Sequence, residues 1–386
     1  MLQTTQTAEY KAFKYLQHWQ REDNLEKLKA SFSQISPFFS YLLQKTEQLY
    51  AQLPLRKDGQ KPFIHPLNVV LALKDAKISD EITLSVGLLH DYVEETVDIY
   101  QHELGAGKKE IDMNALEKYE ERVFRELEKD LLQHGETAKV KTIIEALKLL
   151  TRHKRDFYYR SISAIFQYPD EKIKEIAIPV KLADRMHNIL SINCFTEQER
   201  IYQCFKNLFI LNNTKKYLLE KPEERISKTT TVPSTQLLFK RCSKATYDAF
   251  LTICHLCLRK GIGDIKSMIQ LAFKKFALEK AGVWEVTTVD PDETHLMRLF
   301  HGVVRKYDAR LHQEWTKFEE LKESEYEYCR RFFADFNFSE EQIKTIIDYK
   351  DAYSLKEVVA YLLYLPDYVV HRFLSSDLGE DARICG

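Results

Sequence analysis

The chain has 386 residues, 44% of them apolar, which is enough to bury a substantial core and excludes a largely disordered protein. Lysine and arginine total 57 against 58 aspartate and glutamate, a balance that excludes a general electrostatic attraction to nucleic acid or anionic membranes. The low content of glycine (11) and proline (10) favours helices with short connections over a turn-rich all-β protein. We therefore expect an all-α protein of more than one domain.

The sequence also favours a cytoplasmic location. Residues 1–24 are polar and lack the features of a secretory signal, and the richest apolar stretch, 358–370, is interrupted by Pro366 and Asp367. Seven cysteines scattered through a long chain do not suggest a disulfide framework. We expect neither a membrane nor a nucleic-acid partner.

Apolar residues recur at helical intervals along most of the chain. Two helices are expected within 8–50, one is opened by His65 and Pro66, and a strongly apolar one covers 82–96. The charged segment 98–138 is predicted to be an inserted surface helix. Further helices are expected near 140–152, 156–167, 172–192 and 197–219.

The composition suggests four parts. Pro222, three consecutive threonines and Pro233 mark 221–235 as a linker. The predicted parts are an N-terminal helical extension (1–41), a helical domain (42–220), the linker (221–235) and a helical C-terminal domain of unassigned role (236–386). The C-terminal part could regulate the protein or form a homo-oligomer.

Four metal-capable residues follow one another on successive predicted helices: His65, His90, Asp91 and Asp184. Two imidazoles and two carboxylates match the ligands preferred by manganese, iron or zinc. His90 and Asp91 are separated by only ~100° on a helix, so both can reach one ion. A capping aspartate beside a packed histidine is the alternative.

Other polar residues accompany these four. Glu94 lies on the same helical face as His90 and Asp91, with Glu95 beside it, and two acids near a metal suit proton transfer. Asn188 and Ser191 follow Asp184 at helical spacing, and such a polar stripe is costly to bury unless it binds a ligand. An exposed polar face remains the alternative.

A glycine-containing loop before His65 carries Arg56, Lys57 and Lys61. Arginine offers two parallel donors to phosphate oxygens and lysine a point charge. The loop is therefore a candidate phosphate-binding group, with an ordinary solvated loop as the alternative.

Three segments in order, RKDGQKPFIHP at 56–66, LLHDYVEET at 88–96 and VKLADRMHN at 180–188, resemble the signatures of the HD hydrolase domain of RelA/SpoT homologues. The resemblance covers about residues 42–215. It implies an all-helical HD-type metal phosphohydrolase fold, followed here by the second helical domain.

The resemblance implies a Mn²⁺-dependent hydrolase that removes the 3'-pyrophosphate of guanosine tetraphosphate or pentaphosphate, giving GDP or GTP and pyrophosphate. By matching position, the metal ligands would be His65, His90, Asp91 and Asp184. Glu94 and Glu95 would be catalytic, and the substrate would be bound by Arg56, Lys57, Asn188 and Ser191. Thr151 and Lys154 would lie near the pocket.

The sequence departs from the family pattern at two of these positions. Glu95 stands where aspartate is usual, which adds one methylene, and Ser191 stands where threonine is usual. A third departure is the insert at 98–138, which is longer than expected. Hydrolysis of another phosphorylated nucleotide, alarmone sensing without turnover, and a scaffold that acts through 236–386 therefore remain alternatives.

The C-terminal half offers weaker signals. Cys254 and Cys257 have metal-ligand spacing but stand among apolar residues, which favours a buried helix. The aromatic residues between Tyr326 and Phe338 favour helix packing, because residues 240–386 lack a basic excess. No segment resembles an alarmone synthetase domain, so hydrolysis without synthesis is expected.

Overall fold

A computed structural model describes residues 19–105, 113–152, 158–221, 231–263, 272, 303, 306–307, 309–311 and 313–370. All regular elements in these ranges are helical, which confirms the all-α class. The helices are α2 (Leu25–Phe32), α3 (Pro37–Tyr50), α4 (Ile64–Asp75), α5 (Glu81–Leu89), α6 (Tyr92–Gly105), α7 (Met113–Leu131), α8 (Thr137–Leu150), α9 (Tyr158–Gln167), α10 (Glu171–Leu190), η1 (Ile192–Cys194), α11 (Glu197–Leu219), α13 (Thr231–Cys254), α14 (Leu256–Arg259), α17 (Trp315–Phe332), η2 (Ala334–Phe336) and α18 (Glu340–Tyr364). None of the described helices is both long and apolar enough to cross a bilayer.

Side-chain caps fix the starts of several helices. Ser36 accepts a hydrogen bond from the Phe39 backbone N–H at the start of α3, where Pro37 occupies the first helical position. Asp80 caps α5 through the Thr83 N–H, and Asp170 caps α10. These short-range signals explain where α3, α5 and α10 begin.

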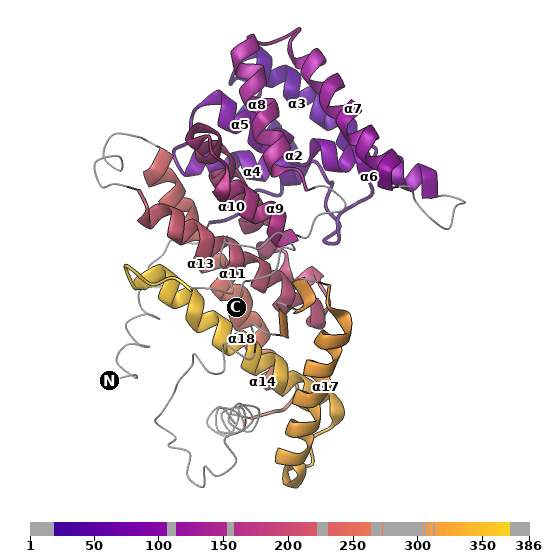
Figure 1. Ribbon diagram of the computed structural model, residues 1–386, viewed down its shortest axis with the longest axis vertical. Helices are drawn as coiled ribbons and strands as arrows, with labels where there is room; N and C mark the ends of the chain where they lie inside the picture. Colours follow the sequence, from indigo (N-terminus) through magenta and orange to yellow (C-terminus); the bar gives the residue numbers. More distant parts are fainter. Residues whose placement is uncertain are drawn as a thin grey trace.

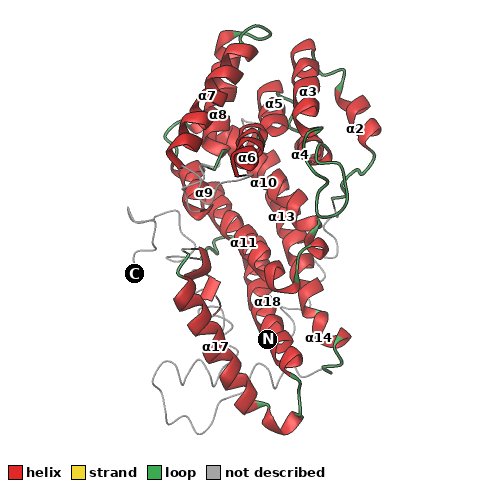
Figure 2. Cartoon of the chain, turned by 90° about the vertical axis from the view of Figure 1, so that its right-hand side faces the viewer, coloured by secondary structure: helices red, strands yellow, loops and turns green. Residues whose placement is uncertain are grey.

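Helix α10 is the centre of the fold. It packs against α4, α5, α8, α9, α11 and α13, and its side chains are buried on nearly all sides from Ile173 to Ile189. In Figure 1 it lies between the N-terminal helices and α13. In the view of Figure 2, α11, α13 and α18 run from this region toward the end of the molecule that carries α14 and α17. Asp184 and Asn188 are therefore held on a helix that is enclosed by six others.

The predicted continuous helix over 82–96 is wrong. The chain leaves the helical pattern at His90 and Asp91, so that α5 ends at Leu89 and α6 begins at Tyr92. At this junction His90 Nε2 lies 3.1 Å from Asp91 Oδ2.

The charged segment at 98–138 also differs from expectation. Its first residues extend α6 to Gly105, and the charged helix within it, α7, covers Met113–Leu131, a shorter range than predicted. Leu116, Val123 and Leu127 lie on the buried face of α7. Residues 106–112 lie outside the described part of the chain.

The predicted linker and the C-terminal half are described in part. Residues 222–230 lie outside the description, but Thr231–Thr235 already form the start of α13, so the linker range is too long at its C-terminal end. Helix α13 packs against α10, α11 and α18 within one continuous apolar core. Cys254 and Cys257 are buried, which supports the prediction that they lie on a buried helix. Phe333 packs against the rings of Phe332 and Phe338, which supports helix packing for the aromatic residues.

Candidate metal centre and adjoining pocket

Three metal-capable side chains meet between α4 and the junction of α5 with α6. His65 Nε2 lies 3.1 Å from His90 Nε2 and 3.3 Å from Asp91 Oδ2, and His90 Nε2 lies 3.1 Å from the same carboxylate oxygen. Donor atoms bound to a single ion at ~2.1 Å stand about 3.0–3.4 Å apart. The three side chains therefore have the spacing of ligands to one divalent ion.

Asp184 on α10 lies beside this group. Its Oδ1 is 3.5 Å from His65 Nε2 and 4.0 Å from His90 Nε2, and its side chain is buried. The structure thus brings together all four residues that the sequence selected, although only His65, His90 and Asp91 form the tightest group. The other carboxylate oxygen of Asp184, Oδ2, pairs with Lys181 Nζ at 2.9 Å.

The tautomers of the two imidazoles suit metal binding. His90 Nδ1 lies 2.9 Å from the Gly87 carbonyl oxygen, so this nitrogen donates a proton and Nε2 of the neutral ring keeps a lone pair. His65 Nδ1 lies 2.9 Å from His187 Nδ1, and when His65 donates in this contact its Nε2 also keeps a lone pair. The two Nε2 atoms then face each other at 3.1 Å with lone pairs that repel unless a proton or a metal cation lies between them.

The electrostatics favour a cation at this place. Burial disfavours charging His90, but the Asp91 carboxylate outweighs this effect and raises the pKa of His90 to about 9. Burial also opposes ionisation of the carboxyls, yet His90 keeps the pKa of Asp91 low, and Lys181 keeps that of Asp184 well below its usual range. Both carboxylates are therefore charged at neutral pH, as ligands must be.

Glu94 and Glu95 stand in the first turn of α6, directly after Asp91. Glu94 Oε1 accepts a hydrogen bond of 2.7 Å from the Arg152 backbone N–H. Burial and the nearby Asp91 charge raise the pKa of Glu94, and the same two causes raise the pKa of Glu95 to about 7. A carboxyl group that titrates near neutrality can exchange a proton with a reactant.

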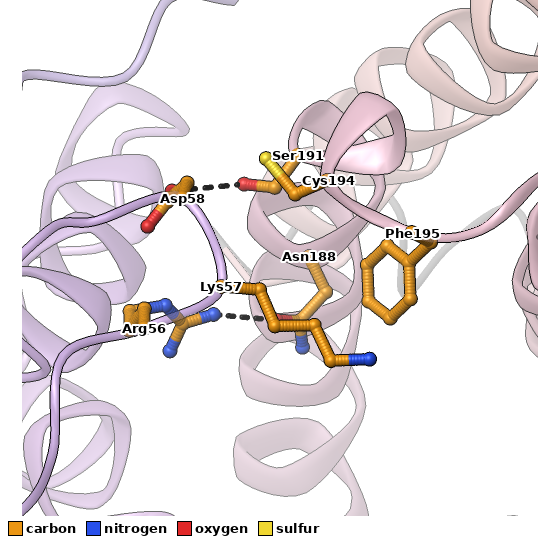
Figure 3. A pocket seen from close by; sticks show the side chains of 7 residues that line it. All are labelled: Arg56, Lys57, Asp58, Asn188, Ser191, Cys194 and Phe195. Atoms are coloured by element: carbon orange, nitrogen blue, oxygen red, sulfur yellow. Dashed lines mark hydrogen bonds between the residues drawn. The ribbon is translucent and has the colours of Figure 1, made fainter.

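A pocket of about 200 Å³ lies between the Arg56 loop and the end of α10 (Figure 3). Its lining residues are Arg56, Lys57, Asp58, Asn188, Ser191, Cys194 and Phe195. All four predicted substrate-binding residues, Arg56, Lys57, Asn188 and Ser191, are among them. Lys61 is exposed and does not line this pocket, Thr151 is buried, and Lys154 lies outside the described residues.

The pocket and the metal-capable group are connected through Asn188. Its amide nitrogen donates to Asp184 Oδ1 at 2.6 Å, and its amide oxygen accepts from the Arg56 guanidinium at 3.1 Å. Gly59, with a positive φ of 79°, allows the tight turn that directs this loop toward α10. A ligand in the pocket would therefore touch residues that also orient Asp184.

Sequence reasoning missed Arg21, which contacts lining residues of the pocket, and Phe195, which lines it. Arg21, from the segment before α2, donates to Ser191 Oγ at 2.8 Å and to Asp58 Oδ2 at 3.0 Å. Phe195 presents its ring to Lys57, whose Nζ lies 4.6 Å from the ring centre, and Figure 3 shows the two side chains on one side of the pocket. Neither residue belongs to the three motif segments, so only the fold reveals them.

No protein-family model, curated protein or solved structure matches the chain in the comparisons with known proteins.

Proposed function

We propose that the protein is a metal-dependent phosphohydrolase of the HD type that acts on guanosine tetraphosphate or pentaphosphate. The observation that carries this proposal is the convergence of His65, His90, Asp91 and Asp184 beside a cation-lined pocket. In this proposal helices α3 to α11 form the HD domain, and α13 to α18 belong to a C-terminal helical module. A nucleotide substrate of this kind would place the activity in the cytoplasm.

The residues fit a divalent metal. Their donors are two imidazole nitrogens and two carboxylates, which suit Mn²⁺, iron or zinc, and their mutual spacing suits a single ion. Such an ion would act as a Lewis acid, neutralising charge on phosphate oxygens and making water more acidic. The proposal names Mn²⁺ because of the resemblance in the motif segments.

The chain's own side chains would do the remaining work. Arg56 and Lys57 would bind phosphate oxygens in the pocket, and Asn188 would align the substrate while it holds Asp184. Glu95, with its pKa near 7, would accept a proton from the attacking water, and Glu94 would donate one to the leaving oxygen. Water attacks phosphorus, and the bond to the 3'-oxygen breaks to release pyrophosphate.

A second candidate substrate class has support in the pocket. The Phe195 ring and the Lys57 ammonium would accept any nucleobase, because stacking depends little on base identity. Another phosphorylated nucleotide is therefore the closest alternative. A catalytically weak alarmone sensor is a further one, because Glu95 stands where aspartate is usual.

A product assay tests the proposal. Purified protein with Mn²⁺ and guanosine tetraphosphate should release pyrophosphate and GDP, whereas Asp184→Asn should release neither. Asp335→Asn, an exposed carboxyl change on η2, is the matched control and should retain activity. Absence of product from guanosine tetraphosphate and pentaphosphate would contradict the proposed substrate, while turnover of a different nucleotide would support the alternative.

A further inference from the structure

A second group of cations lies where α9, α10 and α11 meet the segment before α17. We call it the cation–tyrosine cluster, and its members are Arg185, Lys206, Arg310, Tyr158 and Tyr202. Lys206 Nζ lies 4.9 Å from the ring centre of Tyr158 and 4.7 Å from that of Tyr202. The Arg310 guanidinium lies 4.0 Å from the ring centre of Tyr202. Cations from three segments thus surround two tyrosine rings.

The positive charge of this cluster is not balanced. Arg185 bonds neutral groups, donating to Asn207 Oδ1 at 2.8 Å and to the Gln203 carbonyl oxygen at 3.3 Å. Within the described ranges, no carboxylate forms an ion pair with any of the three cations of the cluster. Burial, reinforced by repulsion from Arg185, lowers the pKa of Lys206 to about 7. Arg185 is buried and the other two cations are half-buried. Cations in such places are costly without a counter-ion, and tyrosine faces relieve only a part of that cost.

Two hydrogen-bond donors of the cluster lack acceptors. Arg310 Nε and the Tyr158 hydroxyl are both buried without a hydrogen-bond partner among the described residues. Buried donors of this kind are normally paired in folded proteins. A guanidinium, an ammonium and a phenol together match the oxygen acceptors and multiple charge of a phosphate group.

We propose that the cation–tyrosine cluster is a binding site for a phosphate-type anion, either inorganic pyrophosphate or the phosphoryl groups of a nucleotide. This site differs from the pocket at the Arg56 loop, since the two share no residue. Because Arg185 follows Asp184 on α10, a bound anion would connect the C-terminal segment at Arg310 with the helix that carries the candidate metal centre. The site does not depend on the proposed hydrolysis.

Calorimetric titration of the full-length protein tests this site. The protein is first treated with a chelator, which removes any contribution from the metal centre, and is then titrated with inorganic pyrophosphate, GDP or guanosine tetraphosphate. Lys206→Met and Arg310→Gln should each weaken binding about tenfold or more, because each removes a charged hydrogen bond. Lys206→Arg should retain affinity, and Lys215→Met, which changes a partly buried lysine on the same helix, is the matched control.

The outcomes separate the two sources of the anion. Binding of pyrophosphate that depends on Lys206 and Arg310 supports a site for the free anion, and nucleotide binding alone with the same dependence supports a nucleotide site. No binding of any of the three ligands would overturn the proposal, as would equal affinities of the wild type and both variants. If Lys206→Met fails to fold, Arg310→Gln decides, and thermal unfolding with and without pyrophosphate provides a second readout.

Discussion

The Nδ1 atoms of His65 and His187 lie 2.9 Å apart in the core of the protein, on the side of His65 away from His90 and Asp91. This contact sets the orientation of the His65 ring, so that its Nε2 faces the other candidate ligands. Burial and the proximity of His65 lower the pKa of His187 well below its usual value, so His187 is neutral and can accept the proton of His65 Nδ1. His187 is thus a positioning residue for the candidate metal centre.

Replacing His187 tests this positioning effect. His187→Leu keeps an apolar side chain of similar size but removes the hydrogen-bond acceptor, and loss of such a partner lowers metal affinity by about 10- to 100-fold. Calorimetric titration with Mn²⁺ measures the change. His255→Leu alters an exposed histidine and should leave the affinity unchanged. Equal affinities for the wild type and His187→Leu would contradict the assigned function of this contact.

Arg21 should contribute to nucleotide binding. It holds Ser191 and Asp58 together at the pocket edge, so Arg21→Leu frees the loop and removes a cation. We expect about tenfold weaker binding of guanosine tetraphosphate, with little change in Mn²⁺ affinity. Equilibrium dialysis with and without Mn²⁺ measures both quantities, and Arg330→Leu on the exposed side of α17 is the control. An unchanged nucleotide affinity in Arg21→Leu would contradict a contribution of Arg21 to nucleotide binding.

Substitutions at Glu95 test whether the protein is an enzyme or an alarmone sensor without turnover. Glu95→Gln removes the proton acceptor but keeps the side-chain size, so kcat should fall by about 10²- to 10⁴-fold while the metal stays bound. Glu95→Asp restores the residue usual in the family and should raise turnover if the wild type is a weak enzyme. Full activity in Glu95→Gln would exclude a catalytic function for this carboxyl.

Asp348 on α18 makes stability depend on pH. Burial, with the nearby Asp351 charge, raises its pKa from 3.8 to about 7. The folded state therefore keeps a proton that the unfolded state releases between these values, so this contribution to stability is present below pH ~4 and is lost as the pH rises through ~7. In Asp348→Asn the change in the free energy of unfolding between pH 4.5 and 7.5 should be smaller than in the wild type by about 3 kcal/mol.

Urea unfolding at the two pH values measures this difference. Asp335→Asn is exposed and should show the same pH dependence as the wild type. An Asp348→Asn variant with the wild-type pH dependence would contradict the buried, protonated state of this carboxyl.

The helices and the residues of the candidate site could be predicted well from the sequence, whereas the local geometry of the site could not. Apolar spacing identified α8 to α11 closely, and residue chemistry selected His65, His90, Asp91 and Asp184, because both signals are local. The break between α5 and α6 could not be predicted, because neither position 90 nor 91 is a proline or glycine, the residues that usually mark the end of a helix. It becomes visible only where both side chains turn toward His65 and Asp184.

Residues outside the motif segments were beyond the reach of local patterns. Arg21 meets Ser191 across 170 positions of the chain, and Arg310 meets Tyr202 only through the packing of the C-terminal half on α11. Charge and periodicity around Arg21 are those of an ordinary surface segment. Such long-range partners depend on tertiary packing, which a single sequence does not specify residue by residue.

Metal analysis of the purified protein tests the central claim most directly. After equilibration with Mn²⁺ and removal of free ions, the wild type should retain about one ion per chain, because its four ligands suit a single site. His65→Ala and Asp184→Asn should each lose it while remaining folded, and Asp335→Asn should keep it. A wild-type protein that retains no Mn²⁺, iron or zinc, or variants that retain as much as the wild type, would contradict the account.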